Sequence, residues 1–213
     1  MRVTLGILRQ SFRLIWEDLW TTLVCNWLWL FANLLIIPGP PATLALIYYT
    51  NLLAHGETAD LKDFWIGFRQ SWKTGWKWGI INLGVLFILL GDLTLLRHAD
   101  GRLLNQFTAG LYLALMAAWL LLQFFTLPLL LEQGTPILLT ALKNGVFLIG
   151  KNLSVSISMA IAIGLLFIAG IAAFMLSFAF GAVLIASASN LTVISCLEKT
   201  KQGKKIIKSN LEI

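Results

Sequence analysis

Residues 26–49 read NWLWLFANLLIIPGPPATLALIYY, and this stretch decides how the chain folds. An apolar run stops at the turn-forming residues 38–41, Pro-Gly-Pro-Pro, and then resumes. Proline and glycine at this density end a helix and reverse the chain. The stretch is therefore either a helix and turn in a soluble core or the two legs of a hairpin inside a bilayer. The second leg, residues 42–54, is short for a membrane crossing, so composition and charge must decide.

The composition favours the bilayer. Hydrophobic residues make up 58% of the chain and charged residues only 12%, whereas soluble domains are about 45–50% apolar and about 25% charged. Too few polar groups remain to cover a globule of 213 residues, so much of the surface must face something other than water. The net charge of +6 does not indicate a nucleic-acid partner, because the charges lie between apolar runs rather than on one basic soluble domain.

The apolar runs predict the membrane segments. A helix needs about 20 apolar residues to cross a hydrocarbon core of roughly 30 Å. The run over residues 154–197 would be about 66 Å long as one helix, so we expect it to fold into two passes that turn near residues 174–177. We predict an all-α, polytopic helical membrane protein, a single integral membrane domain over residues 1–213 with about six transmembrane helices. The expected spans are residues 19–37, 42–54, 76–96, 107–131, 154–174 and 176–197.

Charge settles the short second segment, because lysine and arginine accumulate in cytoplasmic loops. If residues 42–54 cross, fourteen lysines and arginines lie inside with both termini, against Arg97 and Arg102 outside. If they do not cross, the best arrangement places eleven inside and five outside. Six spans are therefore expected. Thirteen helical residues reach only about 20 Å, so the proline turn should lie below the outer surface, screened by neighbouring helices, with Pro41 at the first helical position and Gly56 as a cap.

Three further stretches, residues 4–18, 60–75 and 136–150, predict amphipathic helices on the cytoplasmic leaflet. The apolar face of the first is Leu5, Leu8, Phe12, Ile15 and Leu19. The apolar face of the second is Leu61, Phe64, Trp65, Phe68, Trp72 and Trp76. The third has Thr135 to cap it and Pro136 in its first turn, and its stripe is Leu138, Leu142, Gly145 and Ile149. Basic residues on the second and third helices and in the C-terminal tail are candidate contacts for a partner or for lipid: Lys62, Arg69, Lys73, Lys143, Lys151, Lys204 and Lys205.

Polar residues within the spans allow two interpretations. Amides in membrane helices bond between helices, or they line a path for a solute. The candidates for such a path are Asn26, Asn33, Asn82 and Asn190. Enzyme chemistry finds no support, because His55 and His98 are expected on opposite sides of the membrane and cannot share a metal. The chain also has no nucleophile, metalloprotease or phosphate-loop motif, so we expect no catalytic residue, metal or cofactor.

Three segments carry a resemblance to a known family: NWLWL at residues 26–30, PGPPATLAL at residues 38–46 and DFWIGFRQSWKTGW at residues 63–76. Over about residues 10–95 the chain resembles the YesL-like bacterial membrane proteins, which are defined by a domain of unknown function (624). The doubled proline at Pro40 and Pro41 departs from the single proline usual in that family.

The resemblance implies a multi-pass protein of the bacterial inner membrane, with no catalytic residues and an association with carbohydrate uptake. The expected function is therefore a non-catalytic accessory or permease-like component linked to carbohydrate transport. The alternative is a stand-alone carrier for a small neutral solute. The expected surroundings are the lipid bilayer, and the candidate partners are membrane transport subunits or further copies of the chain.

Overall fold

The computed structural model describes the backbone of residues 2–96, 102–134, 136–172 and 174–211, and the side chains of residues 3–91, 106–134, 136–169 and 178–201. Every regular element in this part of the chain is an α-helix, which confirms the all-α fold class. The helices are α1 (Arg2–Glu17), α2 (Leu19–Leu34), α3 (Gly39–Ala54), α4 (Leu61–Gln70), α5 (Trp72–Leu96), α6 (Arg102–Leu131), α7 (Leu138–Lys151), α8 (Leu153–Ala172) and α9 (Phe174–Leu211).

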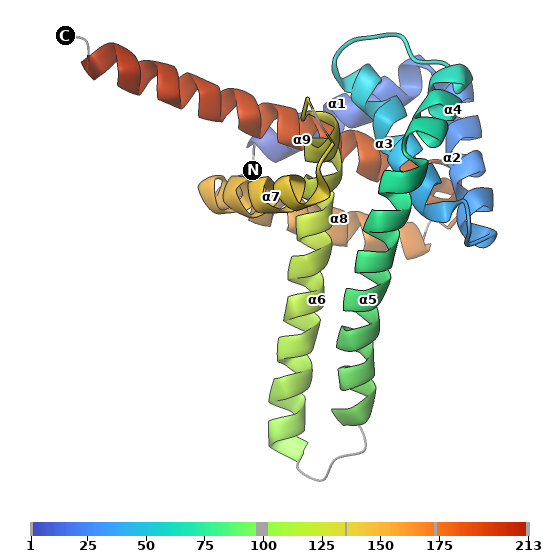
Figure 1. Cartoon of the computed structure of the whole chain (residues 1–213), viewed down its shortest axis with the longest axis vertical. Coiled ribbons are helices and arrows are strands. Elements are labelled where there is room, and N and C mark those ends of the chain that lie inside the picture. Colours follow the sequence, from blue (N-terminus) through green and yellow to red (C-terminus); the bar gives the residue numbers. More distant parts are fainter. Residues whose placement is uncertain (1, 97–101, 135, 173, 212–213) are drawn as a thin grey trace.

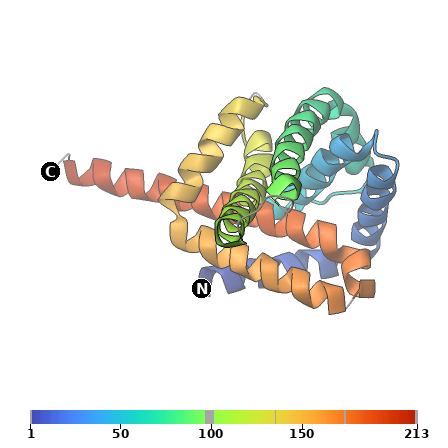
Figure 2. The ribbon, with the colours of Figure 1, turned by 90° about the horizontal axis from the view of Figure 1, so that it is seen from below.

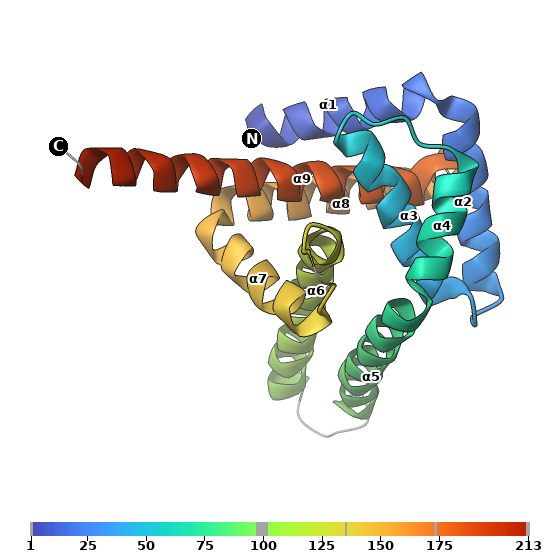
Figure 3. The same ribbon diagram turned by 45° about the horizontal axis from the view of Figure 1, so that its top comes forward.

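The helices α5 and α6 form a long hairpin that projects from the rest of the molecule (Figure 1). Helices α1, α8 and α9 contact one another and run side by side across the base of this hairpin (Figure 2). The last turns of α9 extend away from the other helices (Figure 3). The chain thus has two parts, a projecting hairpin and a cluster of shorter and crossing helices.

The short helix α3 is the centre of that cluster. It contacts α2, α4, α5, α6 and α9, and ten of its sixteen residues are buried, from Gly39 to Leu53. A helix that is buried on most sides needs no polar stripe, which explains why its sequence is apolar almost throughout. The segment that looked too short for a membrane span is therefore the helix around which the others pack.

Two glycines let α5 approach the proline turn. A Cβ atom added at Gly75 would lie 2.8 Å from the Cα of Pro41, and one at Gly79 would lie 2.7 Å from the Cγ of Pro40. Glycines four residues apart share one helix face and allow close backbone approach. A Cβ at Gly67 of α4 would similarly lie 2.8 Å from the ring of Tyr48. This glycine spacing in α5 was not among the features predicted from the sequence.

The structure corrects the boundaries around the proline turn. Helix α2 ends at Leu34 rather than at residue 37, because Ile36 adopts the left-handed conformation with φ of 64°. Helix α3 begins at Gly39 rather than at residue 42, so Pro40 and Pro41 both lie inside its first turn. The expected cap is confirmed, since Gly56 has a positive φ of 79° directly after the last residues of α3.

Other boundaries also differ. The helix expected over residues 60–75 is divided, because α4 ends at Gln70 and α5 begins at Trp72. Helix α7 begins at Leu138, so Pro136 precedes the helix instead of occupying its first turn, and Thr135 lies outside the described residues. Helix α8 ends at Ala172 and α9 begins at Phe174, so the break lies just before the turn expected near residues 174–177. Helix α9 continues to Leu211, whereas the span was expected to stop at residue 197.

Three helical segments are long and apolar enough to cross a membrane: Trp72–Gly91, Gln106–Leu131 and Phe178–Lys201. Helices α7 and α8 provide a fourth if the two, bent by 101°, are counted as one broken span. The faces of α5, α6 and α8 that point away from the molecule are apolar, with Phe87 80%, Phe107 75% and Phe167 68% exposed. A helical membrane protein is therefore supported, whereas the number of six crossings is not confirmed.

Candidate functional site

Asn26 of α2 is bonded to the backbone of α9. Its side-chain amide donates to the carbonyl of Phe178 at 2.8 Å, and its side-chain carbonyl accepts the amides of Ala182 and Val183, each at 3.2 Å. The carbonyl of Phe178 and the amide of Ala182 are the two partners of one i→i−4 step of an α-helix. The side chain is 1% exposed, so this carboxamide fixes α2 against one particular turn of α9.

Asn190 of α9 makes a similar junction with α3. Its amide nitrogen lies 3.0 Å from the carbonyl of Ile47 and 2.9 Å from the hydroxyl of Thr50, and its carbonyl accepts the side-chain amide of Asn51 at 3.1 Å. Asn190 is fully buried. An amide that uses both ends in this way is satisfied without water.

The same network continues to a carboxylate at the end of α6. The amide nitrogen of Asn51 also donates to Glu132 at 2.9 Å, and Nε2 of His55 lies 3.4 Å from the same oxygen. Nδ1 of His55 lies 3.0 Å from the carbonyl of Asn51. Together, Thr50, Asn51, His55, Glu132 and Asn190 form what we call the Asn190 network. Glu132 was not predicted from the sequence, because it follows an apolar run and its partners are more than 50 residues away.

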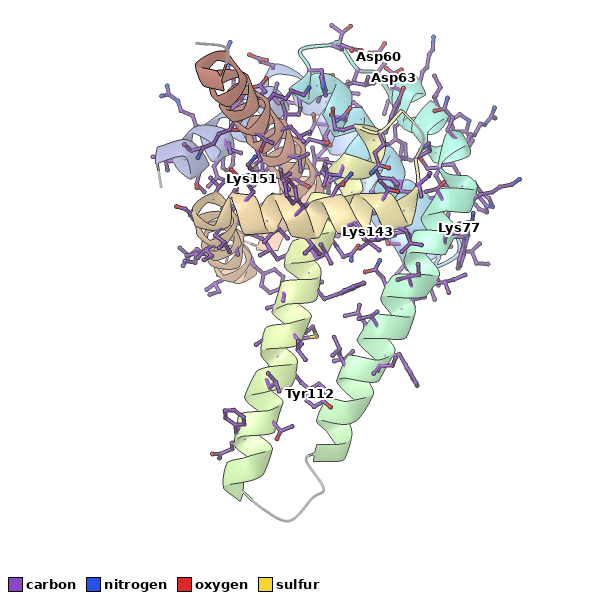
Figure 4. The ribbon with its side chains drawn as sticks, turned by 60° about the vertical axis from the view of Figure 1, so that its left-hand side comes forward. Asp60, Asp63, Lys77, Tyr112, Lys143 and Lys151 are labelled. Carbon is purple, nitrogen blue, oxygen red and sulfur yellow. The ribbon has the colours of Figure 1, made fainter. Side chains whose placement is uncertain are left out.

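Two reciprocal pairs join α5 to α6. The indole of Trp78 donates to Gln123 at 2.9 Å, and the indole of Trp119 donates to Asn82 at 3.0 Å. Each helix thus contributes one tryptophan and one amide, four residues apart. Further along the hairpin, Tyr112 of α6 lies on the side that faces α5 (Figure 4). These pairs hold the hairpin together where it leaves the helix cluster.

The structure does not bond any of the four predicted asparagines to another. Asn26 binds α9, Asn190 binds α3, and Asn82 accepts from Trp119 of α6. Asn33 is exposed at the end of α2 and donates to the carbonyl of Trp29 in its own helix. These contacts favour bonding between helices for three of the four side chains. The solute path stays a prediction.

The predicted basic contacts on α4, α5 and α7 are exposed. The guanidinium of Arg69 lies 5.2 Å from the ring centre of Trp65, and the ammonium of Lys151 lies 5.9 Å from that of Phe147. Cations at this distance over an aromatic face are attracted by the ring. Lys143 and Lys151 lie on the same helix, α7 (Figure 4). Of the seven predicted contacts, Lys62, Arg69, Lys73, Lys143 and Lys151 are exposed, and the side chains of Lys204 and Lys205 lie outside the described part.

The apolar faces of the amphipathic helices are only partly those expected. In α1 the residues that pack inward are Thr4, Ile7, Ser11 and Ile15. Of the predicted face, only Ile15 is buried, while Leu5 and Phe12 are 71% and 52% exposed. In α4 only Phe64 of the predicted face is fully buried, and Trp65 is 50% exposed. Both helices therefore present a second, outward apolar surface, which the sequence pattern did not separate from the inward one.

Metal chemistry has no candidate residues in the part of the chain that the structure describes. No group of three histidine, cysteine, aspartate or glutamate side chains there is close enough to hold an ion. His98 lies outside that part. Cys25 and Cys196 are both buried and free.

Residues 22–93 match the model of a protein family described as "Protein of unknown function, DUF624". The matched segment holds most of α2, all of α3 and α4 and most of α5, and thus the proline turn with both glycines that pack on it. No curated protein and no solved structure shows significant similarity to the chain. The YesL-like resemblance is thereby confirmed over residues 22–93, where the chain matches the DUF624 family model.

Proposed function

We propose that the protein is a non-catalytic, multi-pass protein of a bacterial inner membrane. It acts as an accessory or permease-like component of carbohydrate transport. In this proposal it has six membrane segments with both termini in the cytoplasm. The excess of lysine and arginine on one side supports the orientation, and the YesL-like resemblance supports the link to carbohydrate uptake.

The observation that carries the proposal is that α4 and α7 each have one face fixed in the molecule and one basic face free. In α4, Phe64 and Gly67 are buried, and the amide of Asp60 donates to the carboxylate of Asp63 at 2.8 Å, which fixes the start of the helix. In α7, Ala141, Gly145 and Leu148 are buried. Cations held on rigid helices suit a partner with an acidic surface, because complementary charge guides association.

Affinity purification in mild detergent tests this proposal. We expect a permease or ATPase subunit to co-purify with the tagged protein from cells grown on a carbohydrate source. The paired variants Arg69→Gln/Lys73→Gln and Lys143→Gln/Lys151→Gln should each reduce the amount recovered. Arg9→Gln on α1 is the matched control, since it removes an exposed cation elsewhere. Purification of the chain without any transport subunit would contradict the proposal, as would recovery of only further copies of itself.

A stand-alone carrier for a small neutral solute is the second candidate. It is supported by buried polar atoms without a partner among the described residues: Nε2 of Gln123 and the hydroxyls of Ser156, Ser187 and Thr200. Such atoms can bind hydroxyl groups of an uncharged solute. Uptake into proteoliposomes that contain only this protein would favour the carrier. Asn82→Leu should then abolish uptake and leave folded protein in the membrane, and unchanged uptake would reject the asparagine-lined path.

A further inference from the structure

The proline turn leaves no backbone donor free. In residues 35–42, the amides of Leu35, Ile36, Ile37, Gly39 and Ala42 all donate to nearby carbonyls, at 2.7 to 3.1 Å. The other three residues are Pro38, Pro40 and Pro41, which have no amide hydrogen. The first amides of a helix ordinarily lack a partner within the helix. Most positions at the start of α3 that would have such unpaired amides are prolines, which have no amide hydrogen. The turn therefore has no amide that needs a water molecule as its hydrogen-bond acceptor.

The side chains of the turn are apolar and uncovered. Leu34, Leu35, Ile36 and Ile37, which we call the apolar tip, are 78%, 69%, 72% and 63% exposed. Screening by neighbouring helices was predicted for the proline turn at residues 38–41, and there Gly39 and Pro41 are buried. The four residues of the apolar tip, directly before this turn, are not screened. A loop that emerges into water would carry polar residues. The apolar tip carries none.

The two legs are also short. Helices α2 and α3 have 16 residues each, and such a helix is about 24 Å long, less than the roughly 30 Å hydrocarbon core. Helix α6 has 30 residues, a length of about 45 Å. In Figure 1 the α5–α6 hairpin extends well beyond the turn between α2 and α3. If the long hairpin crosses the bilayer, the short one ends inside it.

We propose that α2 and α3 form a re-entrant hairpin whose apolar tip lies among lipid acyl chains and does not emerge on the far side of the membrane. Non-helical backbone is excluded from hydrocarbon when its polar groups are unpaired, and the missing or paired amides of this turn remove that obstacle on the donor side. The proposal rests on the cytoplasmic placement of both termini given above, and it replaces the first two of the six proposed crossings with a re-entrant pair. The first pair of segments, α2 and α3, then differs from the α5–α6 pair, which crosses the membrane. The residues before α2 and after α3 lie in the cytoplasm, as in the six-span arrangement.

Cysteine labelling tests the proposal in intact cells with a membrane-impermeant maleimide, in a variant that lacks Cys25 and Cys196. Ile36→Cys and Leu35→Cys should stay unlabelled in intact and in permeabilised cells and should react only after denaturation in SDS. Gln106→Cys, near the start of α6, is the control expected to react in intact cells. Lys73→Cys should react only after permeabilisation. Reaction at position 36 in intact cells would overturn the re-entrant hairpin. Reaction at position 73 in intact cells would overturn the orientation itself.

A nitroxide at position 36 then distinguishes lipid from protein around the tip. In nanodiscs we expect frequent collision with oxygen and rare collision with a water-soluble nickel chelate, and the reverse at position 73. Rare collision with both reagents at position 36 would show that a second copy or another protein covers the tip, and would overturn the proposal. Frequent collision with the nickel chelate at that position would also overturn it, because the tip would then be in water.

Discussion

Replacing Asn26 with leucine tests whether α2 is fixed to α9 by a single carboxamide. The substitution nearly preserves side-chain volume and removes the three hydrogen bonds to Phe178, Ala182 and Val183. Hydrogen bonds between membrane helices contribute about 0.6 kcal/mol on average and at most about 1.7 kcal/mol. Three of them give about 2 kcal/mol, with a ceiling of about 5 kcal/mol. The lower figure is expected, because Ala182 and Phe178 can pair with each other once the asparagine is gone.

The assay is unfolding of the purified protein in mixed micelles by titration with SDS, followed by tryptophan fluorescence. Asn33→Leu is the matched control, since it makes the same substitution in the same helix. Asn33 is exposed and its amide donates only to Trp29 of its own helix, so its loss should cost less than about 0.6 kcal/mol. If Asn26→Leu changes the free energy of unfolding by no more than the control does, the carboxamide of Asn26 does not fix α2 to α9.

Three further predictions use the same titration. Gly75→Ala should lower the free energy of unfolding by about 1–3 kcal/mol, because its Cβ would meet the backbone of Pro41 at 2.8 Å. Gly84→Ala is the control, because Gly84 lies in the same helix with open space around it, and it should be neutral or stabilising by up to about 1 kcal/mol. If both variants lost the same free energy of unfolding, the close approach of α5 to Pro41 would be contradicted. Ile36→Gly should stabilise the protein by up to about 1 kcal/mol, since it relieves a left-handed residue with φ of 64°; a loss would show that the turn tolerates isoleucine without strain. A double-mutant cycle of Asn82→Leu and Trp119→Phe should give a coupling of about 0.6 kcal/mol, and a coupling of zero would mean that their 3.0 Å contact does not stabilise the hairpin.

Several features follow from local sequence alone. The helical class, the reversal at residues 38–41 and the cap at Gly56 depend on residue types within a few positions of each other. The match to the DUF624 family over residues 22–93 depends on the same local pattern. Proline and glycine restrict the backbone at their own positions, so these features are readable without knowing what packs against them.

The partners of the polar residues are not readable in this way. Asn26 bonds to Phe178, 152 positions away, and Asn190 bonds to Ile47, 143 positions away. An amide in an apolar run has the same appearance in the sequence whether it bonds to a helix, lines a path or faces lipid. The role of Gly75 and Gly79 is equally hidden, because the prolines that require them lie more than 30 residues earlier.

The charge pattern shows most clearly what sequence determines and what it leaves open. Counting lysine and arginine on each side predicts that the chain returns to the cytoplasm after residue 54, but a crossing pair and a re-entrant hairpin give the same count. Only the tertiary structure supports the choice of the re-entrant hairpin, because it places α3 among five other helices and leaves the apolar tip uncovered. Orientation is set by charges in the loops. The depth that the turn between α2 and α3 can reach in the membrane is set by the lengths of the two helices and by which backbone groups of the turn are already paired.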